Sequence, residues 1–163
     1  MKPLVLLPLL VLAAGMQVTV LPRLTGGEPH LDPVLILVAG IARFSGAAGG
    51  FGGGLLGGLL LGAAGGVALP LAFGYAVTGA VAGWLLEDGS LARLPGLLIS
   101  GPAIPALLAA LEAVTLVGLG LAWPRPPLDA LQHILWNTLL LVPLLAAAPP
   151  RSAADEDLRR MRP

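Results

Sequence analysis

Long apolar runs, separated by short polar intervals, dominate this chain and restrict what it can fold into. The runs cover residues 3–21, 33–42, 46–66, 67–86, 94–123 and 128–148. A helix rises 1.5 Å per residue, so roughly 20 apolar residues cross the hydrocarbon core of a bilayer, which is about 30 Å thick. The pattern predicts an all-α fold: a polytopic membrane bundle of about six transmembrane helices over residues 1–148, with a polar cytoplasmic tail over residues 149–163.

The composition excludes several classes of protein. Hydrophobic residues make up 56% of the 163 residues and charged residues 11%, and the mean hydropathy is +0.91, so a water-soluble fold would lack the polar residues to cover its surface. With a net charge of zero and 4% aromatic residues, the chain lacks the basic surface of a nucleic-acid-binding protein. It contains no cysteine, which excludes disulfides, thiolate metal sites and cysteine nucleophiles.

The first segment, from Met1 to Gln17, allows two interpretations. Its lysine, its apolar stretch and the small residues Ala13, Ala14 and Gly15 are features of a cleavable signal peptide. The apolar run continues to Leu21, however, and is then long enough to span a membrane. We therefore expect a retained transmembrane helix.

The second run, residues 33–42, is short. Its rise of about 15 Å covers half the hydrocarbon core, so it is a tucked helix, a re-entrant piece or a longer helix than its apolar residues suggest. Basic residues in short loops favour the cytoplasmic side. With six crossings from a cytoplasmic start, that side holds Lys2, Arg43, Arg93, Arg151, Arg159, Arg160 and Arg162. Only Arg23 and Arg125 fall outside, so the charges predict six crossings with both termini in the cytoplasm; the family resemblance described below implies that the membrane is the bacterial inner membrane.

The fifth run is longer than a span requires. Pro95, Pro102 and Pro105 lie near its start, and proline inside a helix removes a hydrogen bond and bends the chain. We expect the helix proper to begin around Ala103 after a bent entry.

Glycine recurs at every fourth position of the third run. The row consists of Gly46, Gly50, Gly54, Gly58, Gly62 and Gly66, and a second row of Gly49, Gly53 and Gly57 lies beside it. Four residues are slightly more than one turn, so each row lines a slowly winding groove that another helix can approach closely. That helix belongs either to this bundle or to a partner protein, and the sequence leaves both open.

A few polar residues fall within the apolar runs. Glu112 lies well inside the fifth run, where a carboxyl group must be neutral, paired or in a wet cavity; it marks either a functional site or a hydrogen bond that fixes packing. Its candidate partners are Arg43, His133 and Asn137. Asp129, His133 and Asn137 are spaced by four and share a face of the last run, which favours a hydrogen-bonding stripe between helices.

Catalytic and metal-binding patterns are not found in the sequence. A metal site needs three or four converging ligands, and Asp129 with His133 supplies two, with His30 a remote third. No grouping of serine, histidine and acid is apparent, and no Gly-Lys-Ser or Gly-Lys-Thr follows the glycine-rich run. We expect neither an enzyme nor a bound cofactor.

Several stretches resemble the family of rod shape-determining proteins MreD. They are Leu31-Asp32-Pro33-Val34-Leu35-Ile36-Leu37, Gly50-Phe51-Gly52-Gly53-Gly54 leading to Gly66-Val67, Ala72-Phe73-Gly74-Tyr75 followed by Gly79, and Leu135-Trp136-Asn137-Thr138-Leu139 before a charged tail. The family commonly has an aspartate about four residues after the second glycine, where this chain has Gly58 or Gly62, and no role is carried over through it.

The resemblance implies a non-enzymatic scaffold of the cell-elongation machinery, which controls cell shape and peptidoglycan synthesis. Its partners would be the bitopic protein MreC and, through it, the glycan polymerase RodA and a penicillin-binding transpeptidase, in contact with membrane lipid. The resemblance also implies a bundle similar to the substrate-binding S components of vitamin transporters. The alternatives are such a transporter subunit, which binds a small ligand, and a proton or ion pathway built on Glu112.

Overall fold

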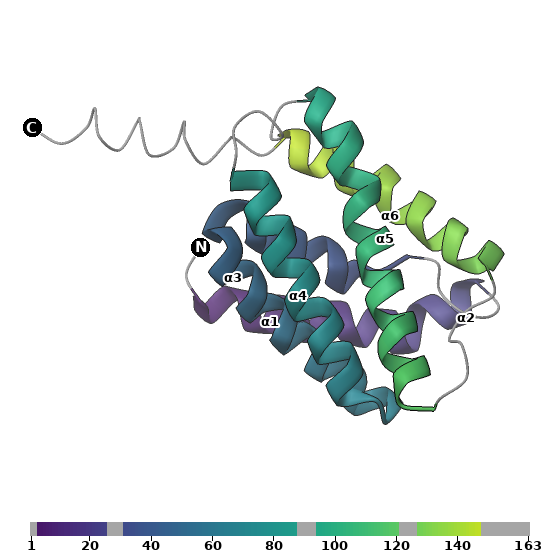
Figure 1. Cartoon of the computed structure of the whole chain (residues 1–163). Helices are drawn as coiled ribbons and strands as arrows, with labels where there is room; N and C mark the ends of the chain where they lie inside the picture. Colours follow the sequence, from purple (N-terminus) through teal and green to yellow (C-terminus); the bar gives the residue numbers. More distant parts are fainter. Residues whose placement is uncertain (1–2, 26–30, 88–93, 121–126, 148–163) are drawn as a thin grey trace, which may run out of the picture.

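The computed structural model describes residues 3–25, 31–87, 94–120 and 127–147. Within these ranges nearly every residue is helical (Figure 1), which confirms the all-α prediction. The elements are α1 (Pro3–Gly15), a π-helical turn (Met16–Val20), α2 (Leu21–Thr25), α3 (Pro33–Gly65), α4 (Ala68–Glu87), α5 (Leu94–Gly118) and α6 (Pro127–Ala147). His30 and the predicted tail lie outside the described residues.

Among the described residues, five helical segments are long and apolar enough to cross a membrane. They are Leu6–Thr25, Pro33–Gly65, Ala68–Leu86, Gly96–Gly118 and Leu128–Ala147. The second and third apolar runs both lie in α3, where they form two helical arms on either side of a break at Gly46. The expected number of six crossings therefore stays a prediction.

Helix α3 breaks at Gly46 and folds back on itself. Gly46 has φ 71° and ψ −166°, a conformation that glycine adopts without steric cost because it has no Cβ. Residues 33–45 and 47–65 form two arms: Val34 packs against Gly57 and Ala42 against Gly50. Residue numbers rise along one arm as they fall along the other, so α3 is an antiparallel helical hairpin. The first arm, 33–45, rises about 20 Å, less than the hydrocarbon core.

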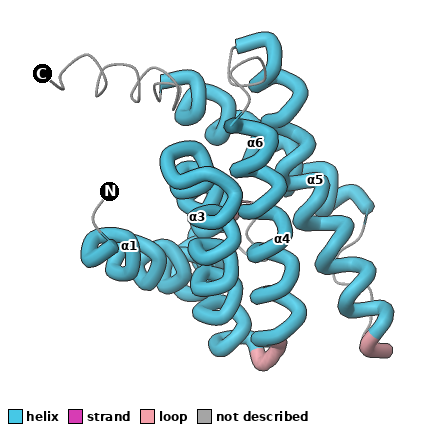
Figure 2. The backbone as a smooth tube through the Cα atoms, turned by 60° about the vertical axis from the view of Figure 1, so that its left-hand side comes forward, coloured by secondary structure: helices cyan, strands magenta, loops and turns pink. Residues whose placement is uncertain are grey.

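The second arm of α3 packs against α4 over its whole length, and α3 lies between α1 and α4 (Figure 2). A Cβ at Gly50 would lie 2.7 Å from the carbonyl carbon of Gly79, and the reverse holds for Gly79. The two backbones touch, so this contact between the second arm of α3 and α4, which we call the glycine seam, requires glycine and other small residues. Close backbone contact is typical of membrane helices, because the hydrophobic effect does not drive them together within the bilayer.

Helix α5 begins at Leu94 and contains Pro102 and Pro105, so the expected start near Ala103 was wrong. Neighbouring helices hold a proline-containing membrane helix together even though hydrogen bonds are missing. Here Leu97, before the prolines, and Leu108, after them, are both fully buried. Packing on both sides of the prolines thus keeps one continuous element.

The two ends of the bundle hold different turns. Leu6, Phe44 and Ala147 line one cavity, which places the start of α1, the Gly46 turn and the end of α6 together; we call this the Gly46 end. Gly66 and Leu119 line a second cavity, which defines the opposite, Gly66 end.

Candidate functional site

The first arm of α3 begins inside the bundle, at Asp32. The backbone N–H of Asp32 donates to Oδ1 of Asn137, 2.8 Å away, at the centre of α6. The Tyr75 hydroxyl, near the centre of α4, donates to Oδ2 of Asp32. Asp32, Tyr75 and Asn137 are all buried, so a helix N-terminus lies at mid-depth rather than at a surface.

The first backbone N–H groups of α3, which have no acceptor within the helix itself, all have hydrogen-bond partners. Pro33 has no N–H to satisfy. The Val34 N–H donates to Oε1 of Gln17 at 3.4 Å, and the Leu35 N–H donates to Oδ1 of Asp32 at 2.8 Å. Ile36 N–H donates to the Asp32 carbonyl oxygen at 3.2 Å. Unsatisfied N–H groups at the start of a helix are costly in an apolar environment, so this arrangement is what allows the arm to begin there.

The π-helical turn at Met16–Val20 contributes Gln17 to the same cluster. The side-chain oxygen of Gln17 accepts the hydrogen bond from the Val34 N–H. A π-helical turn inserted in a helix shifts the side chains that follow. Gln17 of the first span therefore bonds Val34, while Tyr75 of α4 and Asn137 of α6 bond Asp32, so side chains from these three segments meet the start of the first arm of α3.

Asn137 connects Asp32 to His133. Because the Asp32 N–H can only donate, Oδ1 of Asn137 is the acceptor and Nδ2 the donor. Nδ2 donates to the His133 carbonyl oxygen at 2.8 Å and lies 3.3 Å from His133 Nδ1. Both side chains are buried. The polar stripe expected on the last span thus faces inward, toward the start of α3, and Asp129 is only half-buried.

Glu112 lies beside the cluster, on α5. It is buried, its Cγ borders Gly74 of α4, and its carboxyl is close enough to interact electrostatically with Tyr75. Arg43, an expected partner, lies elsewhere: its Nη1 donates to the Leu86 carbonyl oxygen at 3.3 Å. Leu86 and Gly74 are separated by about 18 Å along α4. The structure therefore does not bring Arg43 and Glu112 together.

Arg43 instead joins the Gly46 turn to the last turn of α4. The final carbonyl groups of a helix carry partial negative charge, and a cation that hydrogen-bonds them is favourable. Arg43 is buried, so its contact holds the α3 hairpin against α4 from inside.

The glycine row lies within this seam. Gly50, Gly54, Gly58 and Gly62 are buried against the backbone of α4, while Gly53 and Gly57 of the second row are buried against the first arm. The row's ends differ: Gly46 forms the break, and Gly66, with φ 74°, caps α3 and is exposed. The middle of the row is thus occupied by this chain's own helices.

Sequence reasoning did not single out Asp32, Tyr75 or Gln17 as site residues. The signal that could have found Asp32 is the pair Asp32-Pro33 before an apolar run, a typical helix start. Tyr75 and Gln17 carry no local pattern, because only the fold brings them to the start of the first arm, at Asp32 and Val34 respectively.

Two cavities open on the sides of the described helices, with volumes of about 410 and 660 Å³. Arg43 is the one charged residue that lines the first, and Thr115 the one polar side chain that lines the second. The Thr115 hydroxyl already donates to the Leu111 carbonyl oxygen at 2.7 Å. Among the described residues no group of three or more His, Asp or Glu converges as metal ligands would.

Comparison of the chain with family models, curated proteins and solved structures gives no match.

Proposed function

We propose that this protein is a non-enzymatic scaffold of the bacterial inner membrane that acts in the cell-elongation machinery. It holds a bitopic partner of the MreC type by lateral contact between transmembrane helices. In this proposal the chain crosses the membrane six times, with the first arm of α3 in the second crossing, and the Gly46 end faces the cytoplasm.

One observation carries the proposal: the N-terminus of α3, which lies inside the bundle, is capped by the chain's own Asp32. In membrane transporters, a broken helix at mid-depth directs its positive N-terminal end at an anionic substrate or leaves polar groups for an ion. Here Asp32, Gln17, Tyr75 and Asn137 satisfy that end and one another. These four side chains therefore hold neighbouring helices together, which favours a structural role for the cluster.

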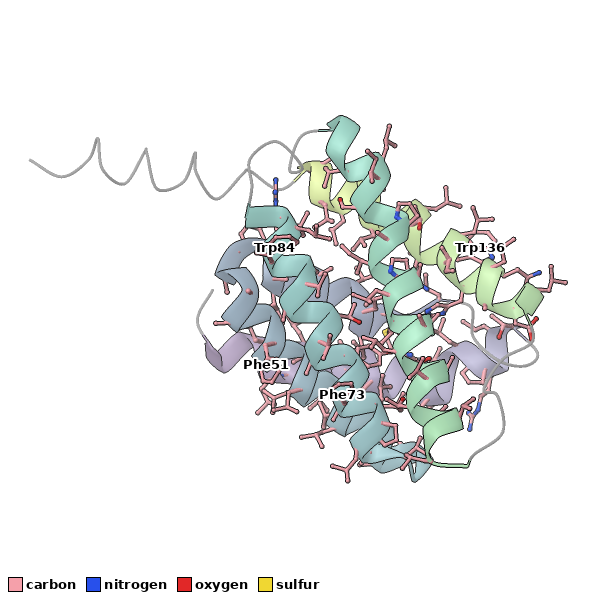
Figure 3. All side chains as sticks on the ribbon, viewed as in Figure 1. Phe51, Phe73, Trp84 and Trp136 are labelled. Carbon is pink, nitrogen blue, oxygen red and sulfur yellow. The ribbon has the colours of Figure 1, made fainter. Side chains whose placement is uncertain are left out.

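The outer surface fits the same role. Phe51 on α3, Phe73 and Trp84 on α4 and Trp136 on α6 are exposed (Figure 3), each with about half or more of its area accessible. Long apolar faces are what a membrane helix presents to lipid or to another helix. The glycine seam is not among these faces, so a partner would dock on the outside of the bundle.

The alternative, a ligand-binding subunit of a vitamin transporter, rests on the cavity at the Gly66 end. Its volume of about 660 Å³ lies within the range of small-molecule sites. Such sites also carry a few polar groups that orient the ligand. Thr115 is the one polar side chain among the described residues that line this cavity. Its hydroxyl donates to a carbonyl oxygen of its own helix, so the lining offers little to orient a ligand.

Site-specific photo-crosslinking in the native membrane tests the proposal. A benzophenone amino acid is placed at one exposed position per face: Leu12, Phe51, Phe73, Val114 and Leu135. Crosslinks from one face to a bitopic cell-shape protein, identified by mass spectrometry, are the expected result. Crosslinks to an ATPase and a coupling subunit would instead establish the transporter alternative, and a lack of protein crosslinks from every face would refute the scaffold.

A further inference from the structure

The side-chain amide of Asn137 is fixed in one orientation from two sides. The Asp32 backbone N–H can only donate, so the amide oxygen must face it, at 2.8 Å. The His133 backbone carbonyl oxygen can only accept, and the amide nitrogen lies 2.8 Å from it. All three residues are buried. Turning the amide over would break both hydrogen bonds at once, at a place where unpaired polar groups are costly.

This orientation decides which ring nitrogen of His133 carries the proton. The amide nitrogen of Asn137, which can only donate, lies 3.3 Å from Nδ1 of the ring. Nδ1 must therefore accept, and a neutral imidazole whose Nδ1 accepts carries its proton on Nε2. A protonated ring has an N–H on both nitrogens and would set a donor against a donor at Nδ1. His133 is thus neutral while this contact is closed, whatever Nε2 meets.

Acidic side chains surround the contact. The titratable side chains described on the elements around His133 are Asp32 at the start of α3, Tyr75 of α4, Glu112 of α5 and Asp129 of α6 itself. Asp32 accepts at both carboxyl oxygens, from the Leu35 N–H and the Tyr75 hydroxyl, as an ionised carboxylate does. Arg43, the one basic residue of α3, lies at the other end of the first arm. Negative charge favours an imidazolium, whereas the contact with Asn137 excludes one.

We propose that the contact between Asn137 and His133 is a proton-sensitive latch that joins α6 to the start of α3. Ring and amide lie one turn apart on the same helix, so they stay adjacent when the ring takes up a proton from water. The amide then turns over and offers its oxygen to the new Nδ1–H. Its nitrogen now faces the Asp32 N–H, so that hydrogen bond is lost and α6 is released. Protonation of buried histidines is a known way to switch contacts between helices. The inference does not depend on the scaffold role.

Nuclear magnetic resonance of the full chain in detergent micelles tests the position of the proton. The chain has two histidines, so a His30→Asn background leaves His133 as the one histidine, and nitrogen-15 signals of its ring distinguish the tautomers. The spectrum is recorded at about pH 7.5, one unit above the ordinary pKa of histidine of about 6.5. The proton is expected on Nε2 alone. A proton on Nδ1 at this pH would overturn the assignment.

Replacing the amide tests whether residue 137 sets the tautomer. Asn137→Asp keeps an acceptor for the Asp32 N–H but has no N–H for the ring, so the ring proton is expected to move to Nδ1. Gln132→Glu is the matched control, because it makes the same amide-to-carboxyl change on α6 at a half-buried position beside His133. It should leave the proton on Nε2, and circular dichroism checks that both variants fold. An unchanged tautomer in Asn137→Asp, or the same change in Gln132→Glu, would overturn the latch.

The link to α3 is measured on the backbone N–H signal of Asp32 as the pH is lowered to about 5.5, one unit below the ordinary pKa of histidine. This signal is expected to shift with the same midpoint as protonation of the His133 ring. His133→Asn places an oxygen near the position of Nδ1 and takes up no proton, so its Asp32 signal should not move. Equal movement in that variant would indicate titration of a carboxyl group and overturn the latch. A ring that protonates without moving the Asp32 signal, or that stays neutral at about pH 5.5, would also overturn it.

Discussion

Replacing Gly54 by alanine should destabilise the bundle far more than the same change at Gly52. A Cβ at Gly54 would lie 2.5 Å from the Tyr75 carbonyl carbon and 2.9 Å from the Ala76 Cα, against 3.4 Å for an ordinary contact. The second arm of α3 and α4 must then separate by at least 3.4 minus 2.5, or about 0.9 Å. The obstacle is backbone on both sides, so no side chain can rotate away.

The expected cost follows from this separation. Overpacking a tight core costs about 1–3 kcal/mol, and this seam should lie at the upper end because separation also loosens the contacts at Gly50 and Gly58. A Cβ at Gly52 meets nothing within 4 Å, so Gly52→Ala should stabilise the helix by roughly 0.5–1 kcal/mol. The two variants should therefore differ by about 2–4 kcal/mol.

Unfolding by SDS in mixed micelles, followed by circular dichroism, measures this difference. Gly54→Ala is expected to unfold at a clearly lower SDS fraction than wild type, and Gly52→Ala at the same or a higher one. Equal midpoints for the two variants would refute the backbone contact between α3 and α4 from which the magnitude was derived.

Three further changes test the polar cluster and the topology. Asp32→Ala should lower the free energy of unfolding by about 2–4 kcal/mol in the same SDS assay, because it removes an N-cap and leaves the Leu35 N–H and the Tyr75 hydroxyl without their acceptor. Asp32→Asn keeps one acceptor oxygen and should lose less. Equal losses in the two variants would contradict the capping role. Gln17→Leu should cost about 1–3 kcal/mol by leaving the Val34 N–H unsatisfied, and a neutral effect would mean that the N–H has another partner. The chain has no cysteine, so a single introduced cysteine is the only labelling site. Ser45 and Ala64 are both exposed and lie near opposite ends of the bundle. An impermeant maleimide on intact cells should label Ala64→Cys and spare Ser45→Cys, and the reverse result would invert the proposed orientation.

The sequence determined the class of fold and the position of most helices. Apolar runs of about 20 residues have few alternatives to helix in a bilayer, because every backbone N–H and C=O must be satisfied within the segment. The glycine spacing likewise identified a face that permits close approach, since the period of a helix fixes which residues share a side. The break at Gly46 was also visible as the boundary between two runs.

Only the tertiary structure decided which partner that face meets and what the interior polar residues do. Spacing gives the face of a helix but not its neighbour, so the sequence could not choose between α4 and another protein for Gly54. It grouped Glu112 with Arg43, which the fold separates, and passed over Gln17, which lies in a π-helical turn and accepts a hydrogen bond from the Val34 N–H. Asp32 and Asn137 are far apart in the sequence, and their hydrogen bond depends on how the helices pack in three dimensions. The pattern of residues along the chain does not reveal which distant residues lie close together in space.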